Sequence, residues 1–452
     1  MSKMGKLLIS ILALASILFP PPVHATSSVS FVDQGVWVVD GERFFPLILY
    51  WGAGPQNEEA TWAKMKQAGL NSTITGISGP FFNFAGQNNI KIMASFSQGS
   101  FDLQTTITYW KNDSSLIAWY GWDEPCLFPN YSAEVRNRHE RIHSELDPDH
   151  PIYVYNGCIS NLAPAFDLFA DVVGSGIHAG GTGATNANEA RALHGLVANN
   201  RVKSAIVHIP SPSDENKTLN YLKFRILAAI AGGANGISWF DYSCDGFPEH
   251  NKNGTCDYKA HFGKIATIAA LLNQIKPGLV GSNPLYGKQG DVYVMRRLGT
   301  DGLWYLLAVN THKSLSEKYS VEGFPPNTTF QNIESNKSIT SSSTGTLTET
   351  IEADSSQGLD SQGLGYRIYR QASSVPTQIQ TPSPSHTPTP TPTPTVIPGD
   401  LDHDNDVDNE DWLIMKRDFG KTRTPGWIQV DIIINGKVDL FDYNILVGNF
   451  GR

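Results

Sequence analysis

Basic side chains are in the minority in this 452-residue sequence, which carries 34 Lys and Arg against 43 Asp and Glu. The formal net charge is −9, and no segment gathers Lys and Arg into a stripe. Proteins that bind nucleic acids neutralise phosphates with such a stripe. The charge pattern therefore predicts no nucleic-acid partner.

Long apolar runs are lacking beyond the N-terminus. Residues 7–19 are apolar, but they follow Lys3 and Lys6 and precede Pro20 and a small-residue site at Ala25. This pattern is typical of a cleavable secretory signal peptide over residues 1–25. A membrane-spanning helix needs about 20 apolar residues, so we expect cleavage and not an uncleaved anchor. The mature chain is predicted to be secreted or attached at the cell surface, without a stable membrane span.

Cysteine is limited to four residues, Cys126, Cys158, Cys244 and Cys256. No Cys-x-x-Cys pair or neighbouring His cluster accompanies them, which argues against zinc ligation by these cysteines. Disulfides form in exported proteins, so two disulfides are expected. The spacing alone leaves the pairing open. We favour Cys244 with Cys256, and Cys126 with Cys158.

Short β-type runs alternate with helical ones between residues 45 and 240. This alternation is typical of a parallel sheet covered by helices. Eight segments are strand candidates: Phe45–Trp51, Ser72–Gly76, Ile90–Phe96, Leu116–Trp122, Ile152–Asn156, Asp171–Ile177, Ser204–Ile209 and Gly236–Phe240. Helical periodicity is present in residues 58–68, 133–146, 218–231 and 258–275.

Eight such units within about 250 residues predict an α/β protein built on a (β/α)8 TIM barrel, over residues 27–282. The alternative is an open doubly wound sheet, but no Gly-rich phosphate loop follows the first strand. Residues 284–371 alternate as strands without helical period, which predicts a C-terminal antiparallel β-sandwich. Residues 372–398 are rich in Pro and Thr, a composition that predicts a disordered linker with polyproline II character.

The strongest motif follows this linker, in residues 399–452. Acidic residues stand at positions 1, 3, 5, 7, 9 and 12 of a loop that begins at Asp400. This is the ligand spacing of an EF-hand loop, in which oxygen atoms converge on Ca²⁺. The predicted metal ligands are Asp400, Asp402, Asp404, Asp406, Asp408 and Asp411.

A second loop begins 31 residues later, and an apolar helical run follows each loop. The predicted ligands of the second loop are Asp431, Asn435, Asp439 and Asp442, while Ile433 at position 3 offers no oxygen. The duplicated loop and helix resemble a type I dockerin, a small α-helical calcium-binding module. The resemblance implies calcium as the bound ion, with weaker binding in the second loop. It also implies a cohesin-domain protein as the partner.

The fourth predicted strand leads into Trp122-Asp123-Glu124-Pro125. In (β/α)8 barrels the chemistry lies at the C-terminal ends of the strands, and Pro125 restricts Glu124 to extended backbone. Neighbouring strand residues point to opposite faces, so we expect one of the two acids in the site and choose Glu124. The motif resembles the acid/base position of the (β/α)8 glycoside hydrolase superfamily. The resemblance implies that Glu124 protonates the leaving glycosidic oxygen.

Aromatic residues at the predicted strand ends offer flat apolar faces for sugar rings. The predicted substrate-binding residues are Trp51, Trp122, Tyr155 and Trp239, with His178 and His208 as residues that orient substrate. The alternative for the aromatic side chains is packing of the barrel rim.

Glycoside hydrolysis normally uses a second carboxylate. The seventh predicted strand, Ser204–Ile209, ends without one, so the choice between retention and inversion stays open. Asp241, just after the eighth strand, is our first choice for this catalytic residue. Asp214, Glu215 and Asp123 are the alternatives.

These features together predict a secreted glycoside hydrolase that cleaves O-glycosyl bonds in a polysaccharide or oligosaccharide. Hydrolysis is predicted to need no cofactor, and calcium is assigned to the dockerin-like loops. One rival prediction is a non-catalytic carbohydrate-binding or surface-assembly protein whose barrel lacks the usual nucleophile. Another is a barrel hydrolase that acts on a non-sugar bond.

Overall fold

A computed structural model of the chain describes residues 27–50, 59–96, 102–123, 132–155, 170–176, 183–209, 219–239, 258–312, 314–335, 337–353, 365–372, 401–402, 407–422, 430–432, 436–438 and 440–449. The chain divides into two compact units, one ending at Ser374 and one beginning at Val375. The four cysteines and the predicted signal peptide lie outside the described residues, as does the predicted linker apart from residue 372.

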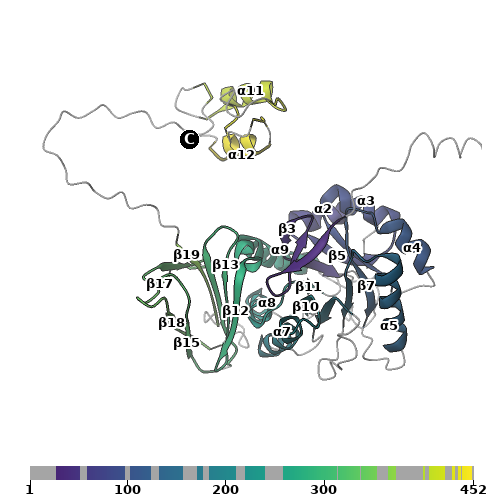
Figure 1. Ribbon diagram of the computed structural model, residues 1–452. Coiled ribbons are helices and arrows are strands. Elements are labelled where there is room, and N and C mark those ends of the chain that lie inside the picture. The colour runs from purple at the N-terminus through teal and green to yellow at the C-terminus, as the bar shows by residue number, and fades with distance from the viewer. Residues whose placement is uncertain are drawn as a thin grey trace, which may run out of the picture. The chain divides into compact units, whose positions relative to one another are not determined.

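The first unit contains a closed barrel of eight strands, in which the last strand pairs with the first (Figure 1). The strands are β4 (Leu47–Tyr50), β5 (Ser72–Gly76), β6 (Lys91–Ser95), β7 (Leu116–Asp123), β8 (Ile152–Tyr155), β9 (Val172–Ser175), β10 (Ser204–Ile209) and β11 (Ile237–Trp239). Every pairing in the barrel is parallel. The predicted TIM barrel and its eight strands are therefore confirmed.

Helices cover the outside of the barrel (Figure 1). They are α2 (Glu59–Gln67), α3 (Gly79–Asn88), α4 (Leu103–Trp110), α5 (Ser132–Arg141), α7 (Gly183–Ala198), α8 (Leu219–Gly232) and α9 (Tyr258–Gln274). The short α10 (Lys276–Leu279) follows α9. The predicted helix over residues 133–146 forms α5 and then a π-helical turn, η3 (Ile142–Leu146). The other three predicted helices are confirmed as α2, α8 and α9.

Both faces of the barrel wall are buried, as expected for parallel strands covered by helices. Every residue of β10 is buried, for example. Successive side chains alternate between the faces, so Ile206 packs inside the barrel, whereas Val207 packs in the outer layer between strands and helices. The strands thus contribute to an inner cluster and to a larger outer cluster.

A small antiparallel sheet closes the N-terminal end of the barrel. Its strands are β1 (Val29–Val32), β2 (Val36–Val39) and β3 (Glu42–Phe44). Trp37 of β2 is fully buried against the inner cluster. Two polar contacts join this sheet to the first residues of barrel strands: Lys91 Nζ lies 2.7 Å from an Asp40 carboxylate oxygen, and Ser204 Oγ donates to the Gly35 carbonyl at 2.7 Å. The sequence patterns do not separate this sheet from the barrel.

Two antiparallel sheets after the barrel confirm the predicted β-sandwich. The larger has the order β12-β13-β14-β19-β16-β17, and β15 pairs with β18. Their bounds are β12 (Ser282–Gln289), β13 (Val292–Leu298), β14 (Trp304–Asn310), β15 (Glu317–Val321), β16 (Thr329–Asn332), β17 (Ser338–Thr340), β18 (Leu347–Ile351) and β19 (Tyr366–Gln371). Val294 packs toward Tyr319 of the smaller sheet, while Tyr293 and Met295 join the outer layer of the barrel. Both faces of the larger sheet are therefore covered.

The second unit contains one helix after each predicted calcium loop, α11 (Asn409–Asp418) and α12 (Leu440–Asn449). Its core consists of Leu401, Val407, Met415, Val430, Val438 and Leu446. An antiparallel bridge between Thr422 and Lys437 links the two halves. Across the described part of the whole chain, no helix is long and apolar enough to cross a membrane.

Candidate active site in the barrel

A buried aromatic cluster lies in the barrel interior. It consists of Tyr50, Tyr120, Tyr153, Tyr155 and His208, from strands β4, β7, β8 and β10. Tyr50, the last residue of β4, is half-buried, whereas the other four are at most 1% exposed. Of the sequence-predicted residues, the structure brings Tyr155 and His208 together here.

His208 lies at the centre of this cluster. Its ring centroid is 4.2 Å from that of Tyr155 and 6.0 Å from that of Tyr153. The Tyr153 hydroxyl is hydrogen-bonded to His208 Nε2, and the Tyr155 hydroxyl donates to the Gly176 carbonyl at 3.1 Å. Each polar tip is therefore held in place while the ring lies among apolar side chains. Phenol and imidazole groups of this kind can also exchange hydrogen bonds with sugar hydroxyls.

Two glycines near the end of β9 make room for this cluster. A Cβ at Gly174 would lie 2.1 Å from the Tyr153 hydroxyl oxygen, and a Cβ at Gly176 would lie 2.3 Å from the carbonyl oxygen of His208. Either contact is too close for a side chain to be accommodated without displacement. The local sequence of β9 is thus matched to the large side chains of β8 and β10.

The predicted acid/base motif stands at the end of β7. After a register shift in the middle of the strand, Trp122 pairs with Val154 and Asp123 pairs with Tyr155. Val154 belongs to the outer layer and Tyr155 to the inner cluster. Asp123 therefore occupies an inward register position, because the irregularity resets the alternation along the strand. Glu124 is the next residue in the chain.

The remaining predicted residues of the barrel site lie outside the described residues. They are Trp51, Glu124, His178, Asp214, Glu215 and Asp241, and for Trp122 and Asp123 the structure describes the backbone alone. In the sequence, each of the six follows the C-terminal end of a barrel strand.

Trp239 lies on the other face of the barrel wall. Its backbone pairs with Leu49, and both side chains pack in the outer layer, where Trp239 is 2% exposed. The expectation that Trp239 contacts substrate is therefore corrected: its position in β11 directs the ring toward the helices. This residue packs the fold.

A carboxylate with a perturbed pKa also lies outside the wall. Glu189 of α7 is 2% exposed, and burial raises its pKa to about 7, although Ser175 donates to it at 2.7 Å and Arg225 lies nearby. A raised pKa can mark a catalytic acid. Here the carboxylate belongs to the helix layer and not to the barrel interior, so we assign it to packing.

Three of the five described carboxylates of the predicted calcium loops are buried in the second unit. Asp411 and Asp442, at position 12 of the two loops, are fully buried, and Asp431 at position 1 is 3% exposed. Asp411 accepts the backbone N–H of Asp408 at 2.8 Å, and Asp431 accepts that of Gly436 at 3.0 Å. Buried ionised groups need hydrogen bonds or a counter-charge. Oxygen donors held in this way fit a hard cation such as Ca²⁺.

Of the other predicted ligands, Asp402 and Asp408 are described, and Asp408 caps α11 by accepting the Glu410 N–H at 2.7 Å. The ligands outside the described residues are Asp400, Asp404, Asp406, Asn435 and Asp439.

Sequence reasoning missed Tyr50, Tyr120 and Tyr153 as members of the barrel cluster. Their signal is the alternation within the predicted strands, because Tyr153 and Tyr155 are two residues apart and so share a face. It also missed a group formed by His139, His143 and Asp171. The spacing of four residues between the histidines places both on one helix face and could have revealed it.

No protein-family model and no curated protein matches this chain. Solved structures similar to parts of it include a beta-glucuronidase from an uncultured Clostridium sp. (15% identity, TM-score 0.36), which covers 47% of this chain and 46% of that protein. A GH2 beta-galacturonidase from Eisenbergiella tayi has 11% identity and a TM-score of 0.41, with 54% of each chain covered. An alpha-amylase from Geobacillus thermoleovorans has 9% identity and a TM-score of 0.38, with 73% of this chain and 98% of that protein covered. The chain thus spans about half the length of the first two proteins.

Proposed function

We propose that this chain is a secreted glycoside hydrolase that cleaves O-glycosyl bonds in a polysaccharide or oligosaccharide. One observation carries the proposal: the fourth strand of a closed (β/α)8 barrel ends at Asp123, directly before Glu124-Pro125, next to an interior filled with Tyr and His side chains. Active sites of this fold lie at the C-terminal ends of the strands.

Glu124 is assigned as the general acid. It donates a proton to the glycosidic oxygen while the bond from that oxygen to the anomeric carbon breaks. Asp241, two residues after β11, is assigned as the second carboxylate, which either attacks the anomeric carbon or activates a water. Because β11 lies next to β4 and β10 in the barrel, its C-terminal end belongs to the same edge as the other strand ends.

Asp123 is the main competitor of Asp241 for the second role. Its register position opposite Tyr155 supports a place at the barrel interior. Two adjacent acids in one site would hold different duties, since like charges in proximity push their pKa values apart. The two candidates are therefore distinguished by comparing Asp123→Asn with Asp241→Asn, each as a single variant and each combined with Glu124→Gln.

The aromatic cluster is assigned as the floor of the sugar-binding site. Tyr50, at the end of β4, is partly exposed, and its ring centroid is 5.7 Å from that of Tyr120 and 6.2 Å from that of His208. A sugar ring resting on Tyr50 would therefore lie above the Tyr153 and His208 pair. Such flat apolar surfaces with a few fixed polar groups are typical of carbohydrate and small-ligand sites.

The test is a hydrolysis screen of the full chain against plant, fungal and bacterial glycans, with released reducing ends and the anomer of the first product measured. We expect hydrolysis of at least one glycan, strongly reduced in Glu124→Gln and in one of Asp241→Asn and Asp123→Asn. Asp40→Asn is the matched control, because Asp40 is an exposed carboxylate at the opposite end of the barrel. Clear glycan binding without any hydrolysis would favour the non-catalytic carbohydrate-binding protein instead.

We further propose that the second unit is a calcium-binding dockerin that binds a cohesin-domain protein. The support is the duplicated loop spacing together with the burial of Asp411, Asp431 and Asp442. Calorimetry on the full chain should detect one tight calcium site, and Ile433→Asn should strengthen a second, weaker one by restoring an oxygen ligand. Absence of calcium binding, or failure to bind a panel of cohesins in calcium, would refute this assignment.

A further inference from the structure

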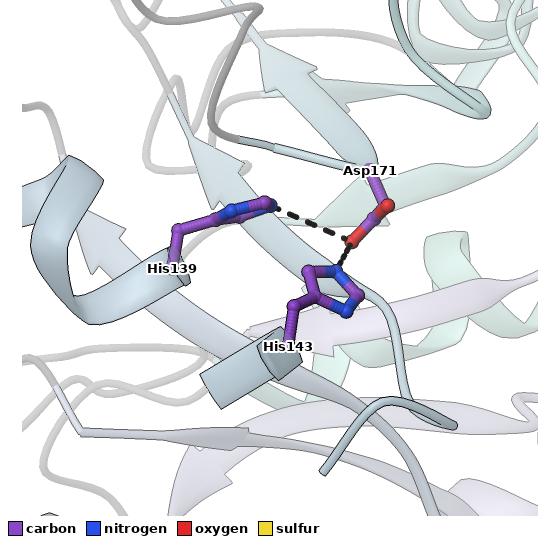
Figure 2. A group of neighbouring side chains, drawn as sticks. All are labelled: His139, His143 and Asp171. Carbon is purple, nitrogen blue, oxygen red and sulfur yellow. Dashed lines mark hydrogen bonds and ion pairs between the residues drawn. The ribbon is translucent and has the colours of Figure 1, made fainter. Parts of the chain in front are cut away.

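Three titratable side chains meet on the outside of the barrel (Figure 2). They lie at the N-terminal ends of strands β8 and β9, whereas the candidate active site is at the C-terminal ends of the strands. His139 lies on α5, His143 on the π-helical turn η3, and Asp171 directly precedes β9. Asp171 accepts the backbone N–H of Ile152, the first residue of β8, at 2.9 Å. The group therefore joins the end of one helix to the N-terminal ends of two barrel strands.

The two imidazoles converge on one carboxylate oxygen. Asp171 Oδ2 is 2.5 Å from His143 Nε2 and 3.9 Å from His139 Nε2. The centroids of the two imidazole rings are 4.7 Å apart. One donor atom from each of the three residues lies within 4.8 Å of the others. In a tetrahedral zinc site with bonds of about 2.0 to 2.2 Å, donor atoms are about 3.4 Å apart. Small side-chain rotations would therefore bring all three donors to bonding distance of one ion.

The ordinary explanation, an ion pair between His143 and Asp171, accounts for only two of the three residues. It leaves His139 half-buried beside a second imidazole, at a distance from Asp171 too long for a hydrogen bond. Burial lowers the pKa of His139 to about 4, so this imidazole is neutral at neutral pH and can act as a metal ligand. The π-helical turn supports the same view, since such turns are frequent at functional sites.

We propose that His139, His143 and Asp171 form a binding site for one divalent transition-metal ion, with zinc as the best match. Two imidazole nitrogens and one carboxylate oxygen are the donor set preferred by zinc, whereas Ca²⁺ and Mg²⁺ prefer oxygen alone. The side chains are 17%, 27% and 19% exposed, which leaves access for the ion and for a water as fourth ligand. The bound ion links α5 and η3 to the N-terminal ends of β8 and β9. It has no part in the proposed hydrolysis.

Asp171 is held ready for this role. Although burial opposes its charged form, hydrogen bonds from His143 and from the Ile152 N–H lower its pKa, so it stays ionised. The carboxylate also has a fixed orientation, because the Ile152 N–H belongs to a barrel strand. Such anchoring of a ligand by its surroundings is typical of metal sites. His143 has to release its proton to the medium when the ion binds.

The test uses the full chain in excess calcium, so that the loops of the second unit are occupied, with Co²⁺ and Zn²⁺ as probes. We expect one Co²⁺ per chain with the visible absorption of a four-coordinate site, displacement by Zn²⁺, and a rise of several degrees in the melting temperature when zinc exceeds its Kd about 100-fold. His139→Gln, His143→Gln and Asp171→Asn should each weaken binding at least about tenfold.

His139→Gln is the most informative variant, because His139 makes no short hydrogen bond within the cluster and its loss should leave the fold intact. The matched controls are Glu145→Gln, which changes an exposed carboxylate on the same turn, and His312→Gln, which lies in the β-sandwich. Both variants should bind the ion as tightly as the unmodified chain. Binding that is unchanged in all three ligand variants, or no binding of either ion below millimolar concentrations, would overturn the proposal.

Discussion

The two ends of the barrel differ in what their side chains do. At the N-terminal end, the sheet β1–β3 covers the interior with Trp37, and contacts such as Lys91 with Asp40 attach it to the strands. At the C-terminal end, Tyr50 and His208 lie near the ends of their strands, and the proposed catalytic acids follow the ends of β7 and β11 in the sequence. The N-terminal end is covered and contributes stability, so the C-terminal end can hold a functional site.

Histidine shows the same contrast. His208 points into the interior and is hydrogen-bonded to the Tyr153 hydroxyl, near the proposed sugar site. His143 lies outside the wall and is bonded to Asp171 at the opposite edge. The residue type alone therefore does not reveal the role; the end of the barrel and the face of its wall do.

The largest effect on stability is expected from Trp37→Ala at the sealed end. Removing a fully buried Trp ring should lower the free energy of unfolding by about 3 to 5 kcal/mol, while the folded fraction keeps its activity. Chemical denaturation of the full chain followed by fluorescence measures the loss. Val38→Ala, at a half-buried position of the same strand, is the control and should cost about 1 kcal/mol. Equal losses would show that the sheet does not seal the interior.

A smaller loss of stability, coupled to activity, is expected from Gly174→Ala at the open end. The new Cβ would lie 2.1 Å from the Tyr153 hydroxyl oxygen, so the ring has to move, at a cost of about 1 to 3 kcal/mol. Sugar binding should weaken as well, because the Tyr153 and His208 pair is displaced. Gly195→Ala, in α7 with open space around its Cβ, should be neutral or slightly stabilising. Unchanged sugar affinity in Gly174→Ala would remove the aromatic cluster from the site.

The smallest effect is expected from Glu189→Gln, which tests whether a carboxylate on the outer side of the barrel wall contributes to stability alone. The folded state holds the Glu189 proton up to about pH 7, so this group favours folding below about pH 4.5 and loses that contribution as the pH rises from about 4.5 to 7. Replacing it should therefore stabilise the protein by about 1 to 2 kcal/mol at pH 8 and change little at pH 4.5. Glu140→Gln, an exposed carboxylate on α5, is the control for unfolding at both pH values.

Activity provides a second criterion for this variant. A carboxylate that packs the helix layer should be replaceable without a change in kcat or in the pH profile of hydrolysis. A large loss of kcat in Glu189→Gln would instead make the raised pKa of Glu189 part of the catalytic machinery.

The barrel could be predicted from the sequence because its strands are short β-type runs at regular spacing, as in Ser72–Gly76 and Ser204–Ile209, which match β5 and β10 to the residue. The sheet β1–β3 could not, because its short strands have no pattern that distinguishes them from a first barrel unit. Trp239 shows the other limit, since a residue at a strand end faces inward or outward according to register, which is fixed by pairing with β4.

The candidate site could be predicted only in part for the same reason. Alternation along the strand does not predict the position of Asp123, because the register shift in β7 places this residue opposite the inward Tyr155. Such an irregularity depends on how neighbouring strands pair and leaves no clear mark in the sequence. Contacts between distant segments, such as that of Tyr153 with His208, could not be predicted from the sequence because they depend on closure of the barrel.

The most direct test of the central claim measures Glu124→Gln on two glycosides of the sugar identified by the screen, one with a poor leaving group and one with an activated aryl leaving group. If Glu124 is the general acid, kcat should fall by about 10² to 10⁴-fold for the poor leaving group. The loss should be much smaller for the activated group, which departs without protonation, and the unfolding transition should be unchanged. Full activity of Glu124→Gln on both glycosides would contradict the account.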